Sequence, residues 1–134
     1  MNSQTIKDIG YFVLRFGLGV LIARHGWPKI TGGVQAWENL GSTMEIFGIT
    51  FAPVFWGFSA AIAEFLGGIC VAVGFLFRPA CVMILITMTV AIISALMEGK
   101  GFNDWAEAAE VAVAFLAMLL MGPGRFSLSV SLKK

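Results

Sequence analysis

The sequence predicts an all-α protein, an integral membrane four-helix bundle with an interfacial or re-entrant segment between its first and second helices. Hydrophobic residues make up 58% of the 134 residues and charged residues only 13%, against about 25% charged in ordinary soluble domains. Four apolar stretches each approach the ~20 residues that a helix needs to cross a bilayer. In hydrocarbon such stretches must satisfy their own backbone groups, which favours helices. The whole chain, 1–134, is therefore predicted to be a single transmembrane domain.

Glycine and proline residues mark the ends of these stretches. The predicted helices therefore span roughly residues 6–25, 54–77, 80–97 and 104–121. Helices commonly end just before such residues. We expect the first helix to stop at Gly26 and Pro28, and the second and third to be joined by a tight turn at Arg78-Pro79. "EGKGFND", residues 98–104, joins the third to the fourth, and Gly122-Pro123-Gly124 ends the last.

The longest connection, residues 30–54, is too polar to span a membrane. Its apolar residues are spaced partly at three and four positions: Trp37, Met44, Ile46, Phe47, Ile49 and Phe51. This spacing is typical of an amphipathic segment that lies at the membrane interface or folds over the bundle.

The distribution of basic residues predicts the orientation. One side of the predicted bundle carries Lys7, Arg78, Arg125, Lys133 and Lys134, and the other carries Lys29 and Lys100 with Arg24 at its border. Because cytoplasmic loops are enriched in lysine and arginine, both termini are expected on the cytoplasmic side of the membrane. All four tryptophans, Trp27, Trp37, Trp56 and Trp105, then fall on the outer side as an interfacial belt.

Ionisable residues within the predicted helices indicate a polar interior, because each costs about 2.5 to 3.5 kcal/mol to insert. They are Arg15, Glu64, Glu107 and Glu110. Residue counts place Glu64 and Glu110 at a similar depth, with Arg15 lower and Glu107 nearer the outer water. Small residues surround Glu64 at helical spacing, as in close helix contacts. We expect Arg15 and Glu64 to form a buried ion pair.

The segment "RHGWPK", residues 24–29, continues the stripe that carries Arg15. His25, the only histidine, and Lys29 would cap the outer end of the polar interior. Two interpretations stay open. Either these are interfacial anchors above a structural ion pair, or Arg15, His25, Lys29, Glu64, Glu107 and Glu110 line a ligand-binding pocket that opens outward. An unpaired carboxylate there would hold a proton more readily than usual.

Three stretches resemble the DoxX family of small four-helix bacterial membrane proteins. They are "LRFGLGVLIARHGWPKI" at 14–30, "AIAEFLGGICVAVGFLFRPA" at 61–80 and "GPGRFSLS" at 122–129. The last ends in Ser129, where the family usually has aspartate. The resemblance implies a subunit or partner in membrane redox systems, and a fold similar to bundles of which some bind quinone.

Two further functions stay open beside a redox-linked subunit that binds a quinone or a similar small ligand. One is a non-enzymatic accessory or assembly partner of another membrane complex, such as a redox protein. The other is a homo-oligomeric pathway for a small solute or for protons. The net charge of +1 and the absence of a basic block exclude nucleic acid as a predicted partner, and a lone histidine gives no basis for a metal site.

Overall fold

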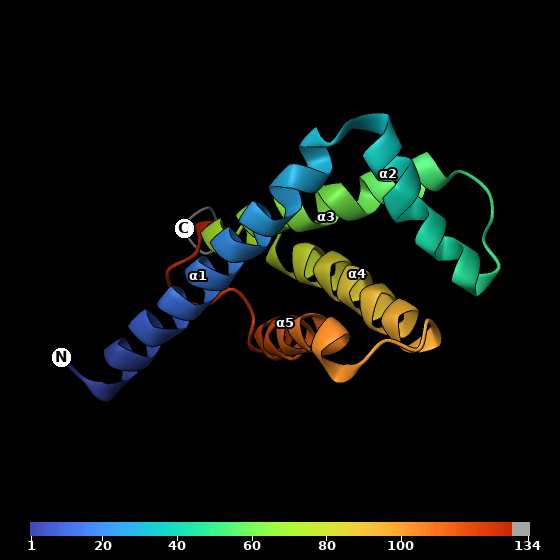
Figure 1. Cartoon of the computed structure of the whole chain (residues 1–134). Helices are drawn as coiled ribbons and strands as arrows, with labels where there is room; N and C mark the ends of the chain where they lie inside the picture. Colours follow the sequence, from blue (N-terminus) through green and yellow to red (C-terminus); the bar gives the residue numbers. More distant parts are fainter. Residues whose placement is uncertain (130–134) are drawn as a thin grey trace.

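A computed structural model describes residues 1–129 and places them in helices joined by short loops (Figure 1). Along the chain these are α1 (Ser3–Thr31), α2 (Gly33–Gly41), the 3-10 helix η1 (Ser42–Phe47), α3 (Pro53–Val73), α4 (Phe77–Met97) and α5 (Phe102–Met121). No strand occurs within residues 1–129, which confirms the all-α class. Lys133 and Lys134, which contribute to the predicted orientation, lie outside the described residues.

The first helix is longer than predicted, and its predicted end at Gly26 and Pro28 is wrong. α1 runs for 29 residues with Pro28 inside it. Proline removes a single backbone donor from a helix. Two side-chain hydrogen bonds nevertheless hold the turn around Pro28: the Trp37 indole donates to the carbonyl of Lys29 at 3.0 Å, and the Thr31 hydroxyl donates to the carbonyl of Trp27 at 2.9 Å. The last turn of α1 is thus held partly by α2, through Trp37, and partly by its own Thr31.

The turn between the second and third long helices lies earlier than predicted. α3 ends at Val73, and Gly74 follows with φ +76°, a left-handed conformation that suits glycine. Pro79 then lies in the first turn of α4 instead of in the connection. Proline is tolerated there because the first backbone donors of a helix have no partner inside it.

The 30–54 connection folds into α2 and η1, which lie along the N-terminal part of α3. Two glycines permit the contact. A Cβ on Gly57 of α3 would lie 1.7 Å from the carbonyl oxygen of Trp37, and one on Gly41 would lie 1.6 Å from that of Pro53. The two backbones therefore touch, and η1 extends from α3 toward α4.

The long helices pack in sequence, α1 on α3, α3 on α4 and α4 on α5. Glycines again set the closest contact. A Cβ on Gly19 of α1 would lie 2.5 Å from the backbone nitrogen of Ala72, and one on Gly68 would lie 2.5 Å from that of Ala23. This pairing of small residues fixes how α1 is aligned along α3, as in membrane helix packing generally.

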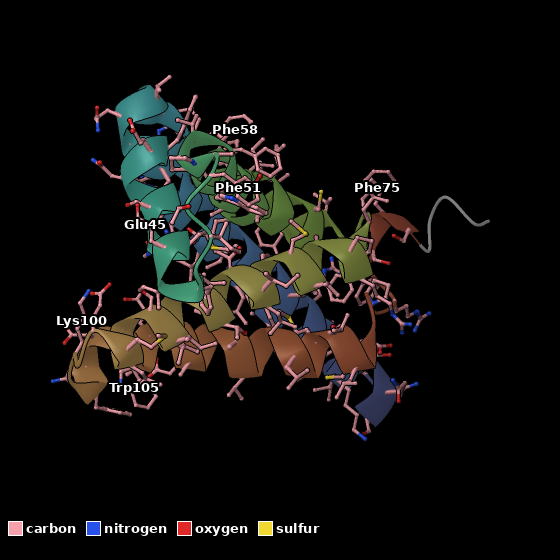
Figure 2. All side chains as sticks on the ribbon, turned by 90° about the vertical axis from the view of Figure 1, so that its right-hand side faces the viewer. Glu45, Phe51, Phe58, Phe75, Lys100 and Trp105 are labelled. Atoms are coloured by element: carbon pink, nitrogen blue, oxygen red, sulfur yellow. The ribbon has the colours of Figure 1, made fainter. Side chains whose placement is uncertain are left out.

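Hydrophobic and polar residues are distributed as in a membrane protein. Leu21, Val113 and Leu120 are 67%, 70% and 77% exposed, whereas Arg15 and Glu64 are each 1% exposed. Phe51, Phe58 and Phe75 are likewise exposed on the outside of the helices (Figure 2). Soluble proteins rarely leave so much contiguous apolar surface in water. By length and composition, α3 and α4 are each able to cross a bilayer.

The core lies where α3, α4 and α5 meet the middle of α1. Its buried side chains are apolar and mostly large. They are Ile22, Val71, Phe77, Ala80, Cys81, Ile84, Met88, Phe115 and Met118. The core therefore fills the end of the molecule nearer the α3–α4 turn. The other end, where α2 and η1 lie, holds the polar side chains and the cavities described next.

Candidate functional site

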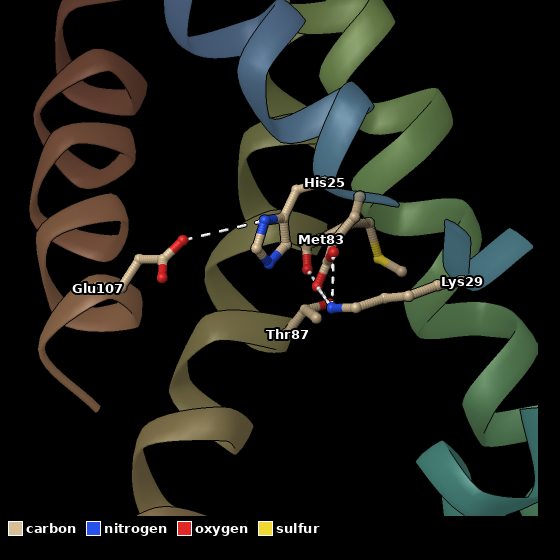
Figure 3. A network of polar contacts seen from close by, with 6 residues as sticks. His25, Lys29, Met83, Thr87 and Glu107 are labelled. Carbon is tan, nitrogen blue, oxygen red and sulfur yellow. Dashed lines mark hydrogen bonds and ion pairs between the residues drawn. The ribbon is translucent and has the colours of Figure 1, made fainter. Parts of the chain in front are cut away.

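A buried ion pair between α1 and α3 is the centre of the candidate site. The Lys29 ammonium donates to both carboxylate oxygens of Glu64, each at 2.8 Å (Figure 3). The Glu64 side chain is 2% exposed and that of Lys29 is 32% exposed. The glutamate is thus enclosed by protein, and its charge is balanced by a lysine that still reaches open space.

Gly26 explains why this pair forms. A Cβ at this position would lie 2.8 Å from the Cβ of Glu64 and 2.6 Å from the backbone nitrogen of Phe65. Only glycine lets α1 approach α3 so closely. Lys29 follows three residues later, near the same face of the helix, and its long side chain can then return to the carboxylate. The "HG" and "PK" of residues 25–29 therefore place one lysine against one glutamate.

The predicted pairing of Arg15 with Glu64 is wrong. Gly19 of α1 lies beside Gly68 and Ala72 of α3, whereas Gly26 lies beside Glu64. Arg15 and Gly26 are 11 residues apart, which is about 16 Å along a helix. This alignment places Arg15 beside the C-terminal end of α3, at Ala72, whereas Glu64 lies in the middle of that helix.

Arg15 is instead bound by backbone carbonyls. Its guanidinium donates to the carbonyls of Ala72 at 3.2 Å, Phe126 at 2.7 Å and Pro123 at 2.5 Å. Ala72 belongs to the last turn of α3, and Pro123 follows the end of α5. The C-terminal ends of helices carry partial negative charge, so they stabilise the arginine without a carboxylate. Arg15 thus holds the C-terminal segment 122–129 and stands apart from the Lys29–Glu64 site.

A cavity of about 370 Å³ opens beside the ion pair, between α2, η1, α3 and α4. We call it the α3–α4 cavity. Lys29 and Glu64 form its polar wall, and its remaining lining is mainly apolar, with residues such as Met44, Trp56, Ala60, Met83, Ile86 and Val90. Ser94, Lys100 and Asp104 line it toward the α4–α5 connection. A mainly apolar cavity with a few polar groups on one wall is typical of small-molecule sites.

A second cavity of about 180 Å³ lies on the other side of the ion pair, between α1, α3, α4 and α5. We call it the His25 cavity. His25 and Glu107 line it, with the His25 Nδ1 3.9 Å from the Glu107 carboxylate (Figure 3). Lys29, Glu64 and Asp104 line both cavities. The ion pair is therefore part of a wall shared by the two cavities.

The six predicted site residues thus separate into two pairs and two isolated residues. Lys29 and Glu64 come together at the shared wall, and His25 and Glu107 face each other across the second cavity. Arg15 lies at the far end of the molecule. Glu110 is exposed on α5 and lines neither cavity.

Sequence analysis missed the cavity residues of the connecting segments. Lys100 and Asp104 lie in "EGKGFND", for which the sequence predicts only a connection between helices. Met44 lies within the 30–54 connection, and Trp56 follows it. The signal available in the sequence was the concentration of charged residues in the short connection 98–104, which could have indicated a polar site there. The apolar residues gave none, because they are indistinguishable in sequence from residues that face lipid.

An exposed ion pair closes the edge of the α3–α4 cavity. The Lys100 ammonium lies 2.9 Å from the Glu98 carboxylate, whose other oxygen accepts from the Ser94 hydroxyl at 3.2 Å. The hydrogen bond from Lys100 lowers the pKa of Glu98 below 4.5, and the same contact raises the pKa of Lys100 above 10.5. This pair therefore joins the loop after α4 to a residue that lines the cavity.

We expect an NMR titration of detergent-solubilised protein to place the pKa of Glu98 below 4.5, and Lys100→Gln to return it toward that value. Because the folded-state pKa of Glu98 is lowered, the stability it adds is present above its unfolded pKa and is lost as the pH falls through the folded one. The contribution of Lys100 is lost in the opposite direction, as the pH rises through its raised pKa. An unchanged Glu98 pKa in Lys100→Gln would contradict this pairing.

These features define a helical membrane protein that encloses an ion pair between two small cavities. The chain belongs to the DoxX family, whose model matches residues 10–97. The matched range runs from α1 through α4 and includes His25, Lys29 and Glu64, while α5 and the 122–129 segment lie beyond it. Comparison with curated proteins and with solved structures gave no match.

Proposed function

We propose that this chain is a redox-linked subunit of DoxX type that binds a quinone, or a similar small carbonyl-bearing ring, in the α3–α4 cavity. The observation that carries the proposal is the placement of Lys29 and Glu64 on one wall of a mainly apolar cavity of about 370 Å³. Such a cavity suits a flat, mostly apolar molecule that carries a hydrogen-bond acceptor at one edge.

The residues of the cavity fit such a ring. An ammonium has three N–H groups, and two of those on Lys29 donate to Glu64. The third is able to donate to a ligand carbonyl oxygen, while Trp56, Met83 and Ile86 would contact the ring. When bound, a quinone supplies electron and proton transfer, and the electrons would come from a partner protein. His25, predicted to contact the ligand, lines only the smaller cavity.

The membrane topology is part of the same proposal. We infer that α1, α3, α4 and α5 form a four-helix bundle across a bacterial inner membrane, with both termini in the cytoplasm. The tryptophans support this arrangement: Trp27 is near the end of α1, Trp56 and Trp105 are near the starts of α3 and α5, and Trp37 is in α2. They would lie together at the outer interface, with α2 and η1 resting there.

An accessory role in a larger complex is the second candidate. Glu110 is exposed on α5, twelve residues before Gly122, in a helix whose neighbouring Val113 is 70% exposed. A carboxylate facing lipid at that depth is costly, so a second protein or another copy of the chain covering this face would stabilise it. This observation concerns α5 alone and is compatible with a ligand in the α3–α4 cavity.

Titration with decylubiquinone tests the proposed ligand. Trp56 lines the cavity, so a bound quinone is expected to quench its fluorescence, and Trp56→Phe should remove that part of the signal. The pair Lys29→Gln with Glu64→Gln removes both charges while keeping similar shapes. We expect it to weaken binding by about tenfold to a hundredfold, as for loss of one charged hydrogen bond.

Lys7→Gln is the matched control, because Lys7 is exposed near the start of α1 and lines none of the cavities described. Equal affinity in the double variant and the control would refute the role of the ion pair. Mass spectrometry of the purified wild type separates the two candidates: a co-purifying quinone supports the first, and a protein partner without quinone supports the second.

A further inference from the structure

A groove of about 590 Å³ runs along the outside of the α1–α3 pair. Its lining comes only from these two helices and shares no residue with the α3–α4 cavity or the His25 cavity. Phe16, Val20 and Trp27 line it from α1, and Phe65, Ile69 and Val73 line it from α3. We call it the Arg24 groove, after the one charged residue in its lining.

The close approach of the two helices produces this groove. Gly19 and Gly68 bring the α1 and α3 backbones into contact. Larger side chains on both sides then stand above that contact, and Trp27 and Phe65 pack together at one end with ring centroids 5.3 Å apart. The result is a surface groove with backbone atoms at its base and apolar side chains along both sides. It faces the lipid if α1 and α3 span the bilayer.

The groove has the length of one membrane leaflet. Phe16 and Trp27 are 11 residues apart, about 16 Å along α1. The hydrocarbon core of a bilayer is about 30 Å thick, so one leaflet contributes about half of that. Trp27 marks the interfacial end because indole rings prefer the headgroup level. A single acyl chain lying in the groove would therefore end close to Trp27 and Arg24.

No acidic side chain among the described residues balances the charge at that end. Arg24 is exposed and lies one helical turn before Trp27, and no acidic residue lines the groove. The ion pairs found among residues 1–129 involve other side chains. An arginine at the interface presents a planar set of donors that matches a phosphate group.

We propose that the Arg24 groove is a binding site for one phospholipid with a net negative headgroup. One acyl chain lies between α1 and α3, against Val20 and Ile69, and the Arg24 guanidinium binds the headgroup phosphate. A zwitterionic phospholipid would bind less well, because its own cation competes for the same phosphate. The site lies outside the proposed ligand cavity and does not depend on what that cavity binds.

Native mass spectrometry of the delipidated protein tests this proposal, with phosphatidylglycerol and phosphatidylcholine of identical acyl chains as the probes. We expect one phosphatidylglycerol to bind in preference to phosphatidylcholine. Arg24→Gln should weaken phosphatidylglycerol binding by about tenfold and remove the preference. Val20→Trp, which fills the groove, should weaken binding of both lipids.

Arg125→Gln is the control, because Arg125 is an exposed arginine at the opposite end of the molecule. It should leave binding unchanged. Arg24 and Val20 are both exposed, so the variants are expected to keep the wild-type melting temperature. Equal binding of the two lipids by the wild type, or equal losses in Arg24→Gln and Arg125→Gln, would overturn the proposal. The proposal would also be overturned if a second protein chain or a prenyl quinone, and not phosphatidylglycerol, occupied the groove and were displaced by Val20→Trp.

Discussion

Lys29→Met is expected to lower the free energy of unfolding by about 3 to 5 kcal/mol, because it leaves the buried Glu64 carboxylate without its partner. The Glu64 side chain is only 2% exposed, so bulk water has little access to its carboxylate to replace the ammonium. Glu64→Gln should cost less, about 1 to 3 kcal/mol. Lys29 is 32% exposed and can turn toward the α3–α4 cavity. The larger loss of unfolding free energy therefore identifies the variant that leaves the enclosed partner, Glu64, unpaired.

Unfolding in detergent by heat or by a denaturing surfactant measures these losses. The double variant Lys29→Met with Glu64→Leu should be less destabilised than the sum of the two single variants, since it leaves no unpaired charge. The exposed pair Glu98 and Lys100 is the matched control, and its removal should barely change unfolding.

A double-mutant cycle of Arg15 and Glu64 separates this arrangement from the one predicted by the sequence. If the two side chains lay together, their losses would be strongly coupled. Glu64 lies in the middle of α3 and Arg15 lies beside its C-terminal end, with no shared partner, so their losses are predicted to add within about 0.5 kcal/mol. Coupling well above that value would contradict the observed alignment of α1 on α3.

The all-helical class, the membrane character and the burial of Glu64 followed from composition and from the rarity of charges in apolar helices. The partner of Glu64 did not, because it depends on how α1 is aligned along α3. That alignment is set by contacts at Gly19 and Gly26 that involve backbone atoms of the other helix. A depth estimate from helix ends cannot supply it, especially when the first helix passes through Pro28 and ends later than expected.

The two ends of α1 illustrate the same difficulty. Arg15 and Lys29 are both cations on one apolar helix, and residue counting favours Arg15 as the counter-ion because its reach overlaps the depth of Glu64. In the structure backbone carbonyls bind Arg15 instead, and sequence patterns do not reveal such carbonyls. Ala72, Pro123 and Phe126 satisfy Arg15 where α3 and α5 end. Carboxylates are thus not the only groups that hold a buried cation in a membrane protein.

Arg15→Leu is expected to release the C-terminal segment 122–129 and to lower the free energy of unfolding by about 3 kcal/mol or more. Each hydrogen bond from a charged donor contributes about 1.5 to 3 kcal/mol, and three are lost, although the freed carbonyls can partly regain water at the membrane surface. Arg15→Lys should recover little, because an ammonium cannot present the same planar set of donors to three separate carbonyls.

Limited trypsin digestion distinguishes release of the segment from general unfolding. Arg125 lies inside the segment, so cleavage after it should become faster in Arg15→Leu at temperatures where α3 and α4 remain folded. Other contacts to the segment, from the Tyr11 hydroxyl to the Gly122 carbonyl and from the Ser129 hydroxyl to the Gly74 carbonyl, would keep it partly attached. Arg24→Leu is the matched control on the same helix, since Arg24 is exposed and far from the segment. If both variants are cleaved at the wild-type rate, Arg15 does not hold the C-terminal segment in place.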